Sequence, residues 1–100
     1  MDLEMTKRFE WDQVIADHNA RKHGVTFDEA RTVFADGLAG IGPDPDHASE
    51  KEERELIAGL SSRSRLLLVS FLELGDVVRI ISARLLTRYE HRLNEEEKFP

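Results

Sequence analysis

Cysteine is absent from the 100 residues of this sequence. The absence excludes disulfides, thiolate nucleophiles and thiolate metal ligands, and it is typical of a protein of the reducing cytosol. No apolar run is long enough to cross a bilayer, and the first twelve residues have no apolar core that would serve as a signal peptide. We therefore expect a cytoplasmic protein without a membrane segment, and the length predicts a single domain over residues 1–100.

Basic residues are in the minority, with 14 Lys and Arg against 20 Asp and Glu and a net charge of −6. This balance argues against binding of nucleic acid through overall charge, because affinity for phosphate backbones comes mainly from clustered Lys and Arg. The charge is uneven, however. Residues 41–60 hold six acids against two bases, whereas residues 61–92 hold six arginines against three acids. A local basic site inside an acidic shell is compatible with this distribution.

A short strand at residues 7–11 and a first helix are predicted at the start of the chain. Asp12 is a good N-cap for the helix, and Gly24 is a good stop. The apolar positions follow i, i+3, i+4, i+7, which is the spacing of one buried stripe. They are Trp11, Val14, Ile15 and His18. We expect this stripe to face the core.

The second helix begins at a capping box, in which Thr26 caps the amide of Glu29 and Glu29 returns the bond. Val25 and Ala30 are placed as a hydrophobic staple. The helix should end near residues 36–37. Its apolar stripe consists of Phe27, Ala30, Val33 and Phe34. Because the turn between the two helices is short, we expect them to pack as a hairpin that covers one face of a sheet.

The second half of the chain predicts strands. A short edge strand at residues 38–42 is followed by a polar loop at residues 43–51, whose prolines prevent regular pairing. An antiparallel meander follows, with strands at residues 54–60, 65–73 and 77–84. A second capping box, from Thr87 to Glu90, begins a C-terminal helix. This order predicts an α+β fold with helices on one side of an antiparallel sheet.

The stretch at residues 77–84 is β-branched and apolar in its first half, as in a strand covered on both faces. We interpret it as a central strand. Because side chains alternate along a strand, Arg79 and Arg84 should point to opposite faces of the sheet. A guanidinium near buried surface is costly unless a carboxylate or an anionic ligand neutralises it.

Arg65 begins the strand beside the one that Arg84 ends, so the two guanidiniums should lie together at one end of the sheet. Like charges placed together require an anion. A phosphate is one possibility. The other is a carboxylate, from Glu53, Glu55, Glu90 or the acidic C-terminal tail. The sequence leaves both open.

Lys22 and His23 are candidates for a general base or a phosphate contact. They also occupy the last turn of the first helix, where positive charge suits the helix dipole without any further role. A weaker alternative is a metal-dependent hydrolase that uses Asp46, His47 and Glu50, although their spacing matches no known metal motif.

Five motifs carry a resemblance to a known family. They lie at residues 9–12, 19–30, 33–34, 59–61 and 79–84, and include the blocks KHGVTFDEA and RIISAR. In order and spacing the chain resembles, from about residue 9 to residue 92, the BrnT family of toxins from bacterial type II toxin–antitoxin systems. The two blocks together are fairly specific, whereas either alone would be weak.

This resemblance implies a RelE-like fold and a ribonuclease toxin that cleaves RNA and halts translation. It also implies neutralisation by a BrnA-type antitoxin, typically in a complex of two toxins with a dimeric antitoxin whose ribbon-helix-helix part binds operator DNA. Contact with DNA would then belong to the antitoxin, in agreement with the negative charge of this chain. The alternative is a catalytically degenerate module that binds the antitoxin without cleaving RNA.

The reaction that the resemblance implies needs neither a metal nor a cofactor, because the ribose 2′-hydroxyl attacks the adjacent phosphate. Such a reaction requires a base, an acid and positive charge at the phosphate. We expect Arg79 and Arg84 to stabilise the phosphate, and Lys22 and His23 to act as base, acid or additional charge. The residues expected to bind RNA are Arg63, Arg65 and Arg88.

Overall fold

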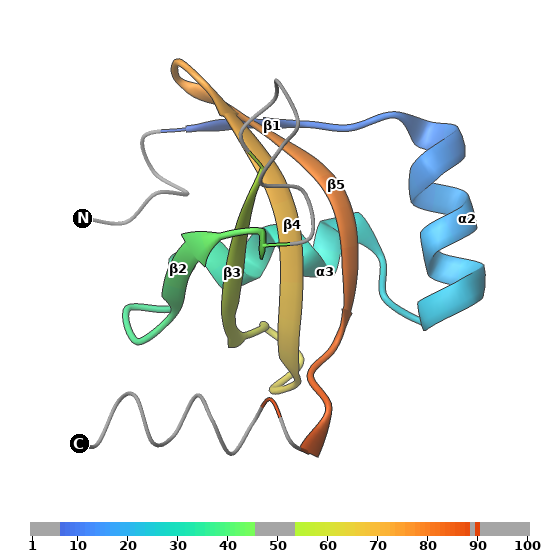
Figure 1. Ribbon diagram of the computed structural model, residues 1–100. Coiled ribbons are helices and arrows are strands. Elements are labelled where there is room, and N and C mark those ends of the chain that lie inside the picture. The colour runs from blue at the N-terminus through green and yellow to red at the C-terminus, as the bar shows by residue number, and fades with distance from the viewer. Residues whose placement is uncertain (1–6, 46–53, 89, 91–100) are drawn as a thin grey trace.

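The computed structural model describes residues 7–45, 54–88 and 90 of the chain, and within them one sheet is packed against helices (Figure 1). The strands are β1 (Arg8–Glu10), β2 (Gly40–Pro43), β3 (Glu55–Leu60), β4 (Leu66–Leu74) and β5 (Val77–Leu85). The helices are α2 (Gln13–His23), α3 (Phe27–Thr32) and the 3-10 helix η1 (Val33–Ala35). The prediction of an α+β fold is confirmed.

The strands follow the order β1-β5-β4-β3-β2 across the sheet. The predicted meander is present, since β2, β3, β4 and β5 pair antiparallel with their neighbours. In contrast, β1 pairs with β5 in parallel, so the sheet is mixed and the prediction of an antiparallel sheet is wrong for this pair. The prediction that residues 77–84 form a central strand is confirmed, since β5 is an interior strand with β1 and β4 as its neighbours. A parallel pair needs a long crossover, which the helices and the rest of the meander supply here.

A β-bulge interrupts β5. The pairing with β4 steps from Phe71–Ile80 to Ser70–Ser82, which leaves Ile81 as an extra residue on β5. An extra residue reverses the alternation of side chains beyond it. The burial pattern records the reversal, because Ile80 and Ala83 are both buried although three positions separate them. Arg79 and Arg84 therefore lie on the same face of the sheet, and the prediction of opposite faces is wrong.

One face of the sheet, called here the helix face, packs against α3 and η1 (Figure 1). The core between them is mainly aliphatic and aromatic, and Phe34 stands at its centre with edge-on contacts to Phe9 and Phe71 at centroid distances of 5.2 and 5.0 Å. The predicted stripe of the second helix is confirmed as buried: Phe27, Ala30, Val33 and Phe34. The opposite side, called here the second face, carries Leu56, Leu68, Ser70, Ser82 and Arg84.

Of the stripe predicted for the first helix, Trp11 is half-buried against the core, whereas the three positions within α2 are exposed. Val14 is 77% exposed, Ile15 is 48% exposed and His18 is also exposed, whereas Ala16 and Asn19 are buried. The reason is that α2 lies beside β5 rather than over the sheet (Figure 1), so only a narrow strip of small and polar residues meets the protein. The helices also fail to form the expected hairpin, since α2 and α3 each pack against β5 rather than along each other.

Helix caps follow the sequence closely. The Asp12 carboxylate accepts hydrogen bonds from the amides of Val14 and Ile15, and Gly24 ends α2 in the left-handed conformation with a φ of 68°. Thr87 and Glu90 form the reciprocal bonds of the second predicted capping box. The rest of that C-terminal helix, and the loop at residues 46–53, lie outside the described residues. Among the described helices, none has the length and apolarity that crossing a membrane requires.

Candidate phosphate-binding site

Arg84 is held on the second face by Glu90. The two Nη atoms of the guanidinium donate to the two carboxylate oxygens at 2.7 and 2.8 Å, which is a bidentate ion pair. The Arg84 side chain is 39% exposed and that of Glu90 is 29% exposed. The hydrogen bonds from Arg84, together with the Thr87 cap, lower the pKa of Glu90 to about 2. Of the partners predicted for this arginine, Glu90 is the one observed.

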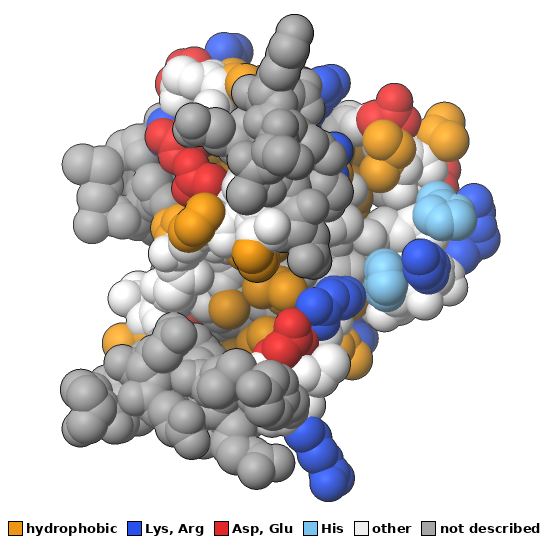
Figure 2. All heavy atoms as spheres, viewed as in Figure 1, with side chains coloured by type: hydrophobic (Ala, Val, Ile, Leu, Met, Phe, Trp, Pro, Cys, Tyr) orange, Lys and Arg blue, Asp and Glu red, His pale blue; other side chains and the backbone are white. Residues whose placement is uncertain are grey.

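A pocket on the second face contains this ion pair. Its floor is formed by Leu56, Leu68, Ser70 and Ser82, and its rim by Asp44, Pro45, Arg54, Arg84 and Glu90. Figure 2 shows hydrophobic side chains in a hollow on this side, next to a basic and an acidic side chain. Ser70 is only 7% exposed, and its hydroxyl has no hydrogen-bond partner in the described part of the chain. The pocket thus combines a guanidinium with an unsatisfied donor.

Arg79 lies on the same face but outside this pocket. Its Nε is 3.2 Å from Glu10 Oε2 on the neighbouring strand, and its side chain is 49% exposed. Arg84 lies five positions after Arg79 along β5, which corresponds to roughly 16 Å between the two Cα atoms of a regular strand. In this structure the two guanidiniums do not share an anion, because Arg79 contacts Glu10 and Arg84 contacts Glu90.

Asn19 connects α2 to the end of β5. Its side-chain amide donates to the carbonyl of Ala83 at 2.8 Å, and its Oδ1 accepts from the Ala83 amide at 3.1 Å. This edge of β5 is available because β1 pairs with β5 only as far as Arg79. A third bond, from Asn19 Nδ2 to the Val25 carbonyl at 3.0 Å, fixes the loop after α2.

The hydrogen bonds between Asn19 and Ala83 attach the second half of α2 to β5, and this half includes Lys22 and His23. Both belong to the last turn of α2, one turn beyond Asn19, while Arg84 directly follows Ala83. Figure 2 shows histidine and Lys or Arg side chains gathered over α2 on the same side of the molecule as the pocket. Lys22 is exposed and His23 is half-buried. The structure therefore brings the last turn of α2 and the Arg84 end of β5 to one region.

Arg65 lies at the same end of the sheet as Arg84, but it points to the helix face. Its Nε donates to Glu29 Oε2 at 2.9 Å, and its Nη2 bonds the other carboxylate oxygen of Glu29 and the carbonyl of Gly24. The Glu29 side chain is 4% exposed and also accepts from Ser61 at 2.7 Å. These bonds, with that from Arg65 first, lower the pKa of Glu29. The prediction that Arg65 and Arg84 share one anion is wrong, because each has its own carboxylate.

The remaining predicted RNA-binding arginines are exposed. Arg63 is 70% exposed at its side chain, with Nη1 3.9 Å from Glu29 Oε1. Arg88 lines a shallow pocket at the end of the sheet, which it shares with Arg65 and Thr87. The structure therefore brings Arg65 and Arg88 together and leaves Arg63 at the adjacent turn.

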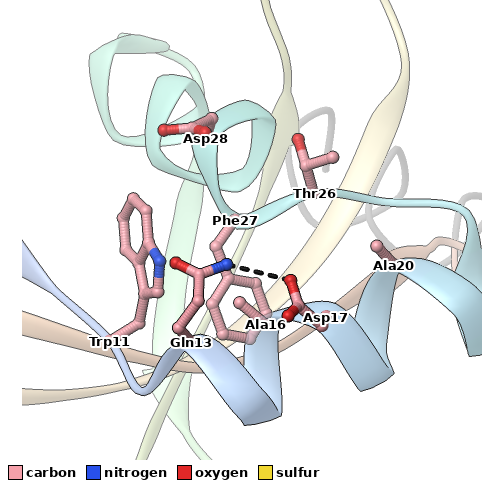
Figure 3. A pocket seen from close by; sticks show the side chains of 8 residues that line it. All are labelled: Trp11, Gln13, Ala16, Asp17, Ala20, Thr26, Phe27 and Asp28. Atoms are coloured by element: carbon pink, nitrogen blue, oxygen red, sulfur yellow. Dashed lines mark hydrogen bonds between the residues drawn. The ribbon is translucent and has the colours of Figure 1, made fainter.

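A second hollow lies between α2 and α3 (Figure 3). Gln13 and Asp17 lie one turn apart on α2, at one wall of the hollow, and share a hydrogen bond of 2.9 Å. The ring of Trp11 packs edge-on against Phe27. The charged residues of its lining are Asp17 and Asp28, and no cation contributes to the lining. This hollow is unsuited to phosphate. Within residues 7–45, 54–88 and 90, no group of three or more His, Cys, Asp or Glu side chains could hold a metal ion. Asp46, His47 and Glu50 lie outside these residues.

Comparison with known proteins begins with the fold. The small mixed sheet with one helix-covered face is similar to the crystal structure of the Brucella abortus ribonuclease toxin BrnT. The TM-score is 0.65 with 21% sequence identity, and the match covers 83% of this chain and 100% of that chain. Among curated protein sequences, none matches this chain significantly.

The family follows from the sequence itself. The family profile described as "Ribonuclease toxin, BrnT, of type II toxin-antitoxin system" matches residues 11–90. This match spans most of the chain, and the chain belongs to the BrnT family of ribonuclease toxins from type II toxin–antitoxin systems.

Two residues of this region have roles that the sequence did not indicate. Asn19 belongs to the motif that carries the resemblance, but only the structure shows it bound to the edge of β5. Glu29 was assigned to a capping box, and its amide does donate to the Thr26 hydroxyl, whereas its carboxylate accepts hydrogen bonds from Arg65 and Ser61 instead of returning the bond to Thr26. For Asn19, its place in the motif at residues 19–30 was the signal available in the sequence.

Proposed function

We propose that this chain is an endoribonuclease toxin with a RelE-like fold, which cleaves RNA in the cytoplasm without a metal and thereby inhibits translation. The observation that carries the proposal is the position of Arg84. The bulge in β5 places this arginine in a pocket on the second face, and Asn19 holds the basic last turn of α2 at the same end of the strand. The guanidinium of Arg84 and the basic last turn of α2 thus lie at the same end of β5, and this arrangement supports the proposal.

The chemistry assigns a role to each group. The ribose 2′-hydroxyl gives its proton to a base and attacks the adjacent phosphorus, and the bond from phosphorus to the 5′-oxygen breaks as an acid protonates that oxygen. The pentavalent phosphate in between gathers negative charge, which Arg84 stabilises while remaining ionised. His23 and Lys22 supply the base, the acid or further charge. Arg79 binds a second phosphate of the same strand. Arg63 and Arg88 contact flanking RNA, and Arg65 extends this surface from the helix face.

The expected partner is a BrnA-type antitoxin in a complex with two copies of each chain. Operator DNA would be bound by the antitoxin alone, because this chain carries a net charge of −6. Masking of the second face by the antitoxin is the simplest way in which such a partner would stop RNA from reaching Arg84.

A second candidate function is that of a degenerate module that binds the antitoxin and does not cleave RNA. The ion pairs favour it, since Arg65, Arg79 and Arg84 each contact a carboxylate in place of a phosphate. In this second candidate function, the arginines stabilise the fold and have no role in RNA cleavage. The two functions differ in what happens when the chain is expressed without its antitoxin.

Growth after induced expression separates the candidates. The chain alone is compared with Arg84→Ala at matched levels of soluble protein. Arrest by the unsubstituted chain and growth with Arg84→Ala support the toxin and the Arg84 site. Arrest by both supports the toxin and removes Arg84 from the mechanism. Growth with both favours the degenerate module.

A further inference from the structure

The Glu90 carboxylate occupies the two Nη atoms of Arg84, which a phosphate would need in order to bind this guanidinium. A carboxylate and a phosphate both bind a guanidinium through two parallel hydrogen bonds, and Glu90 uses both Nη atoms of Arg84. The pocket rim also carries Asp44 and Arg54, so its charges balance while Glu90 is in place. An anion is expected to enter only if the Glu90 carboxylate leaves the guanidinium.

Ser70 supplies the second observation. Its hydroxyl is buried on the floor of the same pocket without a hydrogen-bond partner among the described residues, and Ser82 lies directly opposite it on β5. Arg84 follows two residues further along β5 on the same face. A buried hydroxyl without a partner destabilises a fold, and a bound ligand that accepts its hydrogen bond accounts for its presence.

Resting on the proposed function, we infer that Ser70 and Arg84 together bind one phosphate of the RNA, and that Glu90 is an internal substitute for that phosphate. Glu90 sits on Arg84 in the free protein and is displaced when RNA binds. The exchange is feasible because both side chains are partly exposed. Protonation does not release Glu90 near neutral pH, because its pKa of about 2 keeps it ionised. The RNA must therefore compete for Arg84 directly.

The substitution Glu90→Gln tests the exchange with little change to the helix cap. A glutamine at this position of a capping box still accepts the Thr87 amide, whereas the ionic attraction to Arg84 is lost. Glu73→Gln is the matched control, since it removes the same charge from an exposed residue at the other end of β4, where Glu73 contacts Lys7. Ser70→Ala removes the hydroxyl and leaves Arg84 and Glu90 in place.

Binding of a short 2′-O-methyl RNA of mixed sequence, which cannot be cleaved, is measured by fluorescence anisotropy with the full chain. We expect Glu90→Gln to tighten binding roughly 3- to 10-fold and to steepen the dependence of log K on log salt by about 0.7, because in the unsubstituted chain the displaced Glu90 carboxylate takes up a counterion that offsets the one released at the Arg84 phosphate contact. Glu73→Gln should give a smaller gain and no change of slope. Ser70→Ala should weaken binding roughly 3- to 10-fold while its unfolding midpoint stays unchanged or rises.

Two results would overturn the inference. One is a Glu90→Gln affinity and salt slope equal to those of Glu73→Gln. The other is unchanged RNA binding by a folded Ser70→Ala variant. Because the RNA in this assay is not cleaved, failure of the proposed catalysis is seen separately, as a chain that binds as expected and cuts no ordinary RNA.

Discussion

Two arginine–glutamate pairs at one end of the sheet use the same chemistry in different surroundings. On the helix face, Arg65 binds Glu29 with two nitrogens, and the carboxylate is 4% exposed. On the second face, Arg84 binds Glu90 with two nitrogens, and that carboxylate is 29% exposed. A buried charge that loses its partner is costly, whereas a partly exposed one can exchange its partner for water or a ligand. The first pair is therefore an anchor of the fold, and the second is available for function.

The same substitution in both pairs should separate them most strongly. We expect Glu29→Gln to lower the free energy of unfolding by about 2–4 kcal/mol, because it disrupts a buried network that also includes Ser61. Glu90→Gln should cost about 1 kcal/mol or less. Urea unfolding of both variants measures the difference. Equal losses would show that burial does not distinguish the two pairs.

Arg63→Ala is a control for the Arg65–Glu29 pair, because it removes a second arginine that lies near the same carboxylate. Arg63 approaches the Glu29 carboxylate at 3.9 Å but is mostly exposed, so its removal should change the unfolding free energy by less than about 0.5 kcal/mol. Arg65→Ala, in contrast, should lower both the free energy of unfolding and the rate of RNA cleavage. If Arg65→Ala folds as stably as Arg63→Ala and only RNA binding falls, Arg65 contacts RNA rather than anchoring the fold.

Asn19→Ala tests the link between α2 and the Arg84 end of β5. It removes the bonds to Ala83 and Val25, and we expect a loss of about 2–3 kcal/mol in unfolding free energy. RNA cleavage should fall further than the folded fraction does, since Lys22 and His23 lose their position. Gln13→Ala, which affects only an exposed bond on the same helix, is the control. Cleavage that simply follows the folded fraction would contradict a positioning role.

Acid should weaken both pairs. Both glutamates have pKa values below the ordinary 4.5, that of Glu90 being about 2, so their stabilising contribution is present above about pH 4.5 and is lost as the pH falls toward the folded-state pKa. After allowance for solvent, the Glu90 share is about 1 kcal/mol. Unfolding free energies between about pH 7 and pH 3 should decline less for Glu90→Gln. An equal decline in the unfolding free energies of the unsubstituted chain and of Glu90→Gln would contradict the assignment of this pH dependence to Glu90.

Local signals in the sequence predicted the elements of the fold well. Asp12, Thr26 and Thr87 cap helices as their side chains suggest, and the Gly75–Asp76 turn joins the two strands predicted around it. These features depend on a few neighbouring residues. The parallel pairing of β1 with β5 was not predicted, because it depends on how distant parts of the chain meet.

The candidate site was harder to predict because it depends on a single extra residue. Strict alternation along β5 placed Arg79 and Arg84 on opposite faces, and nothing in the sequence marks Ile81 as the bulge that reverses it. In the same way, periodicity could not show that α2 exposes Val14 and buries Asn19, since that follows from its place at the strand edge. The glutamate partner of Arg84 was among the predicted options, whereas Ser70 gave no signal within an apolar run.

Gly59 shows a packing requirement that only the tertiary structure reveals. A Cβ at this position would lie 2.8 Å from Ala39 Cβ and 3.0 Å from Asp36 Oδ2. The Asp36 carboxylate bonds the amide of Leu60 at 2.8 Å, so the missing side chain lets the segment after η1 close onto β3. The motif at residues 59–61 thus supports the fold on the helix face, beside the Glu29 anchor.

RNA cleavage by the purified chain in the presence of a chelator tests the central claim, that the second face around Arg84 is where RNA is cut. The chain is compared with Arg84→Ala and with Arg8→Ala, a matched loss of an exposed arginine from β1. We predict cleavage by the unsubstituted chain and by Arg8→Ala, and a loss of about 100- to 1,000-fold in the single-turnover rate for folded Arg84→Ala. Cleavage by Arg84→Ala at the rate of the unsubstituted chain would contradict the account.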